Sequence, residues 1–484
     1  MKLHILLACI FVNSVATLKV TSSPQDENCF EGYASVNGLV LTNYIGKQKS
    51  VRVPSSINGA AVYEIDGAFM YVSWVETIEI EDGIKSIKNL GNSSGLKNLK
   101  IGNSVTNLES IGLCKDLQIV NLPKNLKTLH SNLFNGCRSI QRISLPSTIE
   151  VIEDGAFSGS GLQEVELPQS LVKIEARAFS SCLNLKSVKL PSSVITVENG
   201  AFENCAMLEE IELSKGMHDI DERVFSGCKR LKKIELPKQI TEIKKRAFYN
   251  CESLAAIVFP EYLEKIGEGA FQDCSGLQQI YLGQEIKDLG AHSFSACGKL
   301  KDIKINPSNK SLQVENNVLY QNKKSKLVLY PNGLNSPSAS IPETVRTIGI
   351  TAFAFNSDLI QVNLPREIQR IEAGAFEQCD SLTTINFPQG LSYIGEKAFQ
   401  GCINLTDVLF PTSLSYFGDS AFEYCQKIEK VIIPNTNAFI GKNAFNTNHE
   451  GTTISIESLQ EASQSNQGDA PLDLSPTTNP QQNP

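Results

Sequence analysis

The chain repeats a motif of the form A-F-x-x-C every 22 or 23 residues, and this repeat limits the possible folds more than any other feature of its 484 residues. Weaker members fit at Phe69, Leu90 and Ile111, which gives about sixteen repeats of roughly 21 to 23 residues each. A period of this length is typical of a solenoid, in which each short coil stacks on the next. We therefore predict one repeat array, although length alone would suggest roughly three domains. The phenylalanines that anchor the clear repeats are Phe134, Phe157, Phe179, Phe202, Phe225, Phe248, Phe271, Phe294, Phe353, Phe376, Phe399, Phe422 and Phe445.

One repeat, residues 167–191, shows why the coils must stack. Its apolar positions include Leu171, Ile174, Phe179 and Leu185, and most residues between them are polar or small. A coil of this length cannot cover its own apolar side, so stability must come from a continuous core shared with its neighbours. We predict that the phenylalanines are the structural spine of that core, and that truncating one to Ala costs about 3–5 kcal/mol.

Short strands are predicted just before the prolines of the repeats. Residues Ser187 to Leu190, for example, alternate polar and apolar side chains, as a half-buried strand does. Stacking these strands gives a parallel sheet along one face of the array. Proline ends each strand because it lacks the N–H group that the sheet needs. The prolines concerned are Pro168, Pro191, Pro237, Pro260, Pro342, Pro365, Pro388 and Pro411.

Two segments break the period and divide the chain. Phe294 and Phe353 lie 59 residues apart, which is one repeat plus a surplus, and we predict an inserted β-hairpin at 306–340. Alternating runs near the start predict a β-rich cap at 17–65 that shields the edge of the first coil. The repeat array then occupies 66–305 and 341–449.

The two ends of the chain differ in composition from the array. Residues 1–16 carry Lys2, an apolar run and the small residues Ser-Val-Ala at 14–16, which is typical of a cleaved secretory signal peptide. Bacterial lipidation at Cys9 is an alternative that we disfavour because the apolar stretch before it is short. No segment has the roughly 20 apolar residues of a transmembrane helix. The polar residues 450–484 are predicted to be disordered.

Composition argues against several classes of function. The net charge is -8 and the basic residues are interspersed with acidic ones, so there is no basic stripe that could follow a nucleic-acid backbone. The histidines His130, His218, His292 and His449 lie in different repeats, which does not predict a catalytic or metal-binding cluster. We predict no enzyme, no catalytic residues, no cofactor and no metal site.

The cysteines form a column and not a set of pairs. Eleven of the 13, from Cys114 to Cys425, occupy the F-x-x-C position of the repeat. Ser160, Asn356 and Asn448 fill the same position elsewhere, so the position does not require a thiol. We predict buried free thiols that act as small apolar side chains. Disulfides between neighbouring coils are the alternative, because stacked coils lie within disulfide range although their side chains run parallel.

The repeat unit L-P-x-x-L-x-x-I-x-x-x-A-F-x-x-C-x-x-L-x-x-I-x-L-P resembles that of BspA-like leucine-rich-repeat surface antigens. The opening FEGYASVNGLVLTNYIGKQKSVRVPSSINGAAV and the insert NPSNKSLQVENNVLYQNKKSKLVLYPNG resemble the same family, so the likeness spans Phe30 to Phe445. The family is found in bacteria and in parasitic protists such as trichomonads. The resemblance implies a β-dominated leucine-rich-repeat solenoid of the α/β type, a right-handed curved array. It also implies an adhesin-like role outside the cell, since some bacterial members bind fibronectin or fibrinogen, and it implies no catalytic residues.

The outward face of the predicted strands is mostly polar, with two exceptions. Val258 lies beside Tyr281, and Leu409 lies beside Ile432, in neighbouring repeats. Exposed apolar neighbours, particularly with an aromatic ring, are candidate ligand contacts. The alternative is that they are ordinary surface residues, because isolated exposed apolar side chains are common.

Three N-x-[ST] sequences, at Asn92, Asn309 and Asn404, are possible N-glycosylation sites if the protein comes from a eukaryote. Asn309 is the strongest candidate because it lies in the predicted insert. Chance explains all three equally well in a bacterium.

These observations together predict a secreted protein, or one peripherally attached to the cell surface, that binds a protein ligand such as a host or matrix protein. The alternative is a surface-coat antigen or structural array without one defined ligand, which would involve self-association. An elongated surface without a catalytic cluster favours binding over chemistry in both cases.

Overall fold

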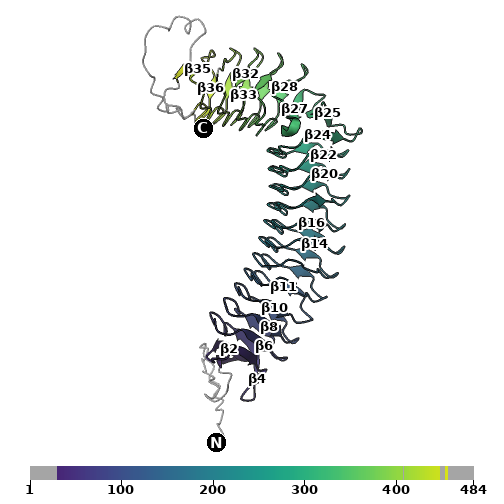
Figure 1. The fold of residues 1–484 in the computed structure, drawn as a ribbon, viewed down its shortest axis with the longest axis vertical. Coiled ribbons are helices and arrows are strands. Elements are labelled where there is room, and N and C mark those ends of the chain that lie inside the picture. Colours follow the sequence, from purple (N-terminus) through teal and green to yellow (C-terminus); the bar gives the residue numbers. More distant parts are fainter. Residues whose placement is uncertain (1–29, 407, 447–452, 456–484) are drawn as a thin grey trace, which may run out of the picture. The chain divides into compact units, whose positions relative to one another are not determined.

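The structure is a computed structural model that describes residues 30–406, 408–446 and 453–455 (Figure 1). The described residues consist of β-strands and turns, with one short 3-10 helix, η1 (Asn332–Leu334). The chain divides into two compact units, Met1–Ile240 and Thr241–Pro484. The predicted signal peptide at 1–16 lies outside the described residues, as does most of the tail predicted at 450–484. No helix in the described part of the chain is long and apolar enough to cross a membrane.

Most turns of the solenoid carry two short strands on different faces, and strands at the same position in successive turns pair in parallel. The first ladder contains the strands predicted before the prolines. In the first unit its strands are β3 (Ser50–Val53), β6 (Thr77–Ile80), β8 (Asn98–Ile101), β10 (Ile119–Asn121), β14 (Ser187–Lys189), β16 (Glu210–Glu212) and β18 (Lys233–Ile234). In the second unit they are β20 (Ala256–Val258), β22 (Gln279–Leu282), β24 (Asp302–Ile305), β28 (Ser338–Ser340), β30 (Gln361–Asn363), β32 (Thr384–Asn386), β35 (Lys430–Ile432) and β37 (Thr453–Ser455).

The second ladder was not predicted from the sequence. Most of its strands are only two residues long, which is too short to show an alternating pattern. In the first unit its strands are β5 (Ala60–Asp66), β7 (Ser86–Lys88), β9 (Asn107–Leu108), β11 (Thr128–Leu129), β12 (Val151–Ile152), β13 (Lys173–Ile174), β15 (Thr196–Val197) and β17 (Asp219–Ile220). In the second unit they are β19 (Glu242–Ile243), β21 (Lys265–Ile266), β23 (Asp288–Leu289), β27 (Lys326–Leu329), β29 (Thr347–Ile348), β31 (Arg370–Ile371), β33 (Tyr393–Ile394), β34 (Tyr416–Phe417) and β36 (Phe439–Ile440).

An antiparallel hairpin begins the described part of the first unit. Strands β1 (Phe30–Ser35) and β2 (Gly38–Tyr44) pair with each other, and β2 then pairs in parallel with β5. The short strand β4 (Ser56–Ile57) pairs with β5 in the antiparallel direction. The ring of Tyr44 lies 5.4 Å from that of Phe69, measured between centroids, so the hairpin covers the apolar end of the first turn. The cap at 17–65 stays a prediction, which this contact of the hairpin supports.

The insert at 306–340 is more than a hairpin. Strands β25 (Leu312–Glu315), β26 (Val318–Gln321) and β27 form an antiparallel meander, and β27 pairs in parallel with β29. Asn316 and Asn317 have positive φ angles of 51° and 62°, which form the tight turn between β25 and β26. The insert therefore contributes a turn of its own, and the solenoid has about seventeen turns instead of the sixteen expected.

Three residues of the segment expected to be a tail, 450–484, are described by the structure. Thr453–Ser455 form β37, which pairs in parallel with β35 one repeat earlier. This pairing extends the first ladder by one more strand. The disorder expected for 450–484 otherwise concerns residues outside the described ones and stays a prediction.

The phenylalanine column runs through the core of each unit. All thirteen anchor phenylalanines are buried. In the first unit the rings of Phe157, Phe179 and Phe202 lie 5.3 Å apart between successive centroids and are nearly parallel. In the second unit Phe376 and Phe399 stack in the same way at 5.0 Å. Each ring thus loses contact with water mainly through the rings above and below it, which is the packing expected of a solenoid. The β-dominated solenoid predicted from the sequence is confirmed.

Candidate binding surfaces

The first candidate contact pair lies on the first ladder of the second unit. Strands β20 and β22 are in register, so that Val258 lies directly beside Tyr281, and Lys304 of β24 follows Tyr281. The side chain of Val258 is 69% exposed and that of Tyr281 is half-buried. Their inward neighbours Ile257 and Ile280 supply the core contacts of these strands. Val258 and Tyr281 are therefore available at the surface.

The second candidate pair lies further along the same ladder. Leu409 and Ile432 form a parallel bridge, and Leu409 is 69% exposed. The strands between the two candidate pairs carry Asn363 and Asn386 at the corresponding outward positions. The structure therefore brings the members of each pair together but separates the two pairs by polar side chains.

A row of aromatic side chains on the second ladder was missed by sequence reasoning. Tyr393, Tyr416 and Phe439 are the outward residues of β33, β34 and β36, and register places them side by side. The ring centroids of Tyr393 and Tyr416 are 4.7 Å apart, and those of Tyr416 and Phe439 are 5.1 Å apart. The guanidinium carbon of Arg370, on β31, lies 3.7 Å from the centroid of the Tyr393 ring. The signal in the sequence is an aromatic residue every 23 positions, in a column that only the second ladder defines.

Comparison with known proteins decides the family. The sequence model of one family, described as the BspA type leucine rich repeat region, matches residues 63–165, 92–209, 196–326 and 329–451. These stretches together cover well over half of the chain. The chain belongs to the BspA-type leucine-rich-repeat family. The resemblance seen in the repeat unit is thereby confirmed, and the repeats that the family model matches include both ladders described above.

Solved leucine-rich-repeat proteins resemble this BspA-type chain at low identity. A leucine-rich cell-surface protein from Faecalibacterium prausnitzii is 21% identical, with 94% of this chain and 99% of that chain covered and a TM-score of 0.46. A leucine-rich-repeat protein from Bacteroides ovatus is 20% identical, with 89% and 98% covered and a TM-score of 0.45. The pneumococcal vaccine antigen PcpA is 19% identical, with 91% and 82% covered and a TM-score of 0.30. Among curated proteins, no sequence matches this chain.

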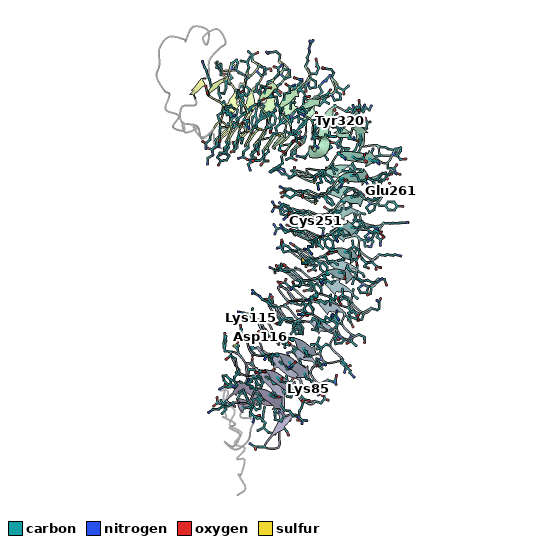
Figure 2. The ribbon with its side chains drawn as sticks, viewed as in Figure 1. Lys85, Lys115, Asp116, Cys251, Glu261 and Tyr320 are labelled. Atoms are coloured by element: carbon teal, nitrogen blue, oxygen red, sulfur yellow. The ribbon has the colours of Figure 1, made fainter. Side chains whose placement is uncertain are left out.

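The cysteine column of this BspA-type chain is buried in the core. The eleven repeat cysteines are all buried and form no disulfide, and Figure 2 labels one of them, Cys251. The thiol of Cys182 donates to the carbonyl oxygen of Phe157 at 3.1 Å, and that of Cys205 to the carbonyl oxygen of Phe179 at 3.2 Å. Burial raises the pKa of the Cys182 thiol to about 11. These thiols are therefore protonated hydrogen-bond donors in the core, which makes them poor nucleophiles.

His292 makes several polar contacts next to the insert. His292 Nε2 is 3.4 Å from a carboxylate oxygen of Glu377, and the backbone N–H of His292 donates to the hydroxyl of Thr351 at 2.8 Å. Burial lowers the pKa of His292, and burial raises the pKa of Glu377. A small cavity of about 20 Å³ beside Ser293 and Thr351 has room for roughly one water molecule. In the described part of the chain, no cluster of three potential metal ligands is present.

The predicted glycosylation sites differ in how their side chains are used. The Asn309 amide nitrogen donates to the carbonyl oxygens of Gly283 and Ile286, each at 3.0 Å, and its amide oxygen accepts from two backbone N–H groups. The Asn404 amide nitrogen donates to the carbonyl oxygen of Asp380 at 2.7 Å. Asn92 is partly exposed in a left-handed turn with φ of 62°. A glycan on Asn309 would have to displace its hydrogen bonds, so its place in the insert no longer makes it the strongest candidate.

Proposed function

We propose that this chain is a non-enzymatic, adhesin-like protein that acts outside the cell and binds a host or matrix protein through the outward face of its first ladder. The observation that carries the proposal is the contact pair of exposed Val258 and half-buried Tyr281, on a face where most outward residues are polar. Clusters of exposed apolar and aromatic residues with a polar rim are typical of protein-binding surfaces. Membership of the BspA-type family and the secretory signal pattern at 1–16 support an extracellular location.

The architecture supports binding more than catalysis. In the described turns, inward side chains fill a continuous core, and the outward side chains of successive strands lie in straight columns. A surface of this kind provides area and repeated contacts to a large partner. A catalytic site instead needs several different groups that converge on one point.

Surface plasmon resonance of the chain from residue 17 against fibronectin, fibrinogen, laminin and host-cell membranes tests this proposal. We expect saturable binding that weakens about fivefold or more for Tyr281→Ala and Val258→Ser, because contacts at the centre of an interface carry most of its affinity. Ile195→Ser, at another exposed apolar residue that is 57% exposed in the first unit, is the matched control and should bind like the wild type. Deleting 306–340 is not a suitable test, because β27 belongs to the sheet that continues through β29.

A surface-coat antigen without one defined ligand is the second candidate. It is favoured by the same repetition, since a stack of similar turns can serve as a durable outer layer. Concentration-dependent self-association in sedimentation, together with no saturable binding to any of these ligands, would support the coat role and contradict the adhesin-like role.

A further inference from the structure

The aromatic row, defined as Tyr393, Tyr416 and Phe439 with Arg370 at one end, is not needed for the core. In the same strands the inward residues Ile371, Ile394 and Phe417 are buried and make the core contacts. The outward residues point away from that core, and Phe439 is 55% exposed. Exposing large aromatic side chains gives up the favourable free energy of burying them. The presence of aromatic side chains at these outward positions is therefore not explained by folding alone.

Other turns of the second ladder carry polar residues at the same outward position. In the second unit the outward residues of β19, β21, β23 and β29 are Glu242, Lys265, Asp288 and Thr347. Lys265 is neutralised by Glu242 at 2.9 Å across the neighbouring turns. A solvated polar column is thus the ordinary state of this face, and the aromatic residues of three successive turns replace it locally.

Arg370 differs from the other cations of this column. Lys326, on β27, forms an ion pair with Glu372 at 2.7 Å. Arg370 is exposed, and in the part of the chain that the structure describes no carboxylate is paired with it. Its guanidinium instead lies over the face of Tyr393, where a cation–π interaction holds it in place. The row therefore ends in a fixed positive charge whose hydrogen-bond donors are available to an anion.

The geometry of the row limits what it can bind. The rings stack on each other with interplanar angles of 7° and 16°, so that neighbouring rings cover each other's faces. Sugars and nucleic-acid bases bind aromatic side chains by stacking on such faces. In the described row only the outer face of Phe439 is left open, so a partner that contacts all three side chains meets mainly ring edges. A partner must instead lie along the edges. Ser392 and Ser415 precede the two tyrosines, and Gly395 and Gly418 follow their strands, so small residues flank the row on both sides.

An extended proline-rich polypeptide matches this spacing. In the polyproline II conformation the chain rises about 3.1 Å per residue, so that every third residue returns to the same side after about 9.3 Å. The two centroid distances in the row, 4.7 Å and 5.1 Å, together span about 10 Å. Two prolines three residues apart would therefore lie at the two ends of the row. Polyproline II has no internal hydrogen bonds, so its carbonyl oxygens are free to accept from the tyrosine hydroxyls.

We propose that the row of Tyr393, Tyr416 and Phe439 docks an extended proline-rich segment of another protein, with an acidic residue of that segment bound by Arg370. Aromatic side chains on a domain surface are a recurrent way to recognise polyproline II segments, because the ligand is already extended and loses little entropy. The surface belongs to the second ladder, so the proposal does not depend on the contact pair Val258 and Tyr281.

Fluorescence anisotropy of the full chain with synthetic peptides tests the proposal. The probe is a labelled peptide with proline at every third position and one Asp next to the terminal proline. We expect saturable binding to this peptide, weaker binding by about threefold to fivefold when Lys replaces Asp, and loss of binding when Gly replaces the prolines. Raising the salt concentration should reduce the preference for Asp over Lys.

Substitutions in the chain separate recognition from stability. Phe439→Ala should weaken binding at least about fivefold, and Tyr416→Phe should weaken it less because only the hydroxyl is removed. Arg370→Gln should abolish the discrimination between the Asp and Lys peptides. Tyr262→Ala and Arg366→Gln, at exposed residues outside the row, are the matched controls. The melting temperature of each variant is measured alongside, so that a variant that fails to fold is recognised, and Arg370→Gln then decides the outcome.

Several results would overturn the proposal. Equal binding of the proline and glycine peptides, or unchanged affinity of Phe439→Ala, would show that the row does not recognise a polyproline II segment. Binding that appears only after removal of 456–484, a segment that contains four prolines, would show that the chain's own end occupies the row. Dimerisation that Phe439→Ala abolishes would show that the row is a contact between copies of this chain. Loss of fibronectin binding on Tyr281→Ala would leave this proposal unaffected.

Discussion

Truncation of a ring in the middle of the phenylalanine column is the most direct perturbation of this fold. Phe179 is fully buried between Phe157 and Phe202, and both ring centroids lie 5.3 Å away. Phe179→Ala leaves a cavity that neighbouring turns cannot close, because their backbones are held by hydrogen bonds such as that from Phe179 N–H to the Ala201 carbonyl at 2.8 Å. Loss of the ring should cost about 3–5 kcal/mol of the free energy of unfolding.

Because each turn contacts only its neighbours, this loss should be local in the first unit. Hydrogen exchange followed by mass spectrometry should show amides of the turns around Phe179 exchanging about 150- to 5,000-fold faster, whereas distant turns change little. Phe179→Leu keeps most of the apolar volume and should have a smaller effect. Val258→Ser, at an outward residue, should leave the exchange nearly unchanged. Equal effects of Phe179→Ala and Val258→Ser, or uniform acceleration across the unit, would refute the stacking argument.

Three further predictions follow from buried polar groups. Cys205→Ser should retain the fold, since a hydroxyl donates to the Phe179 carbonyl as the thiol does. Burial raises the pKa of the native Cys205 thiol well above its usual value, so this thiol should resist thiol reagents at pH 8 until the protein unfolds. Burial lowers the pKa of His292, so the unfolded chain binds more protons at this residue than the folded chain does. The free energy of unfolding therefore falls as the pH drops through about 6.5. His292→Gln should reduce the resulting fall in melting temperature between about pH 7 and pH 5. Asn309→Ala should lower the melting temperature by removing four hydrogen bonds, with Asn309→Gln restoring little because its longer side chain displaces the amide group.

The sequence was sufficient to predict the core because the core obeys a strict period. The residue at an inward position, such as Phe179, must pack against the residue at the same position one repeat away. The sequence repeat therefore follows directly from the packing of the core. Departures from the period were harder to interpret. Tyr330 stacks on Phe353 at 4.7 Å, yet no A-F-x-x-C motif surrounds it, and the extra turn of the insert was therefore missed.

A candidate surface could be predicted only where the strands that carry it were themselves predicted. Val258 and Tyr281 were found because strands of the first ladder end at prolines, and these prolines show the register of the strands in the sequence. The aromatic row was missed because β33, β34 and β36 are two residues long and no proline follows them directly. Once the second ladder is known, positions 393, 416 and 439 fall in one column, and the stack of rings follows from the spacing of turns.

Inward and outward positions of this solenoid are constrained by different forces, and this difference indicates where specificity resides. An inward residue such as Ile394 must fit two neighbours, so its replacement disturbs the stack. An outward residue such as Tyr393 contacts mainly its own column, so that column can change from turn to turn without altering the fold. The column at Lys173 illustrates the alternative, because Lys173 pairs there with Glu175 at 3.0 Å and with Glu198 at 2.8 Å. The same backbone thus presents a neutralised charge ladder in one place and an aromatic row with an unpaired cation in another. Packing selects neither of them, so the outward residues can differ between parts of the surface while the fold stays the same.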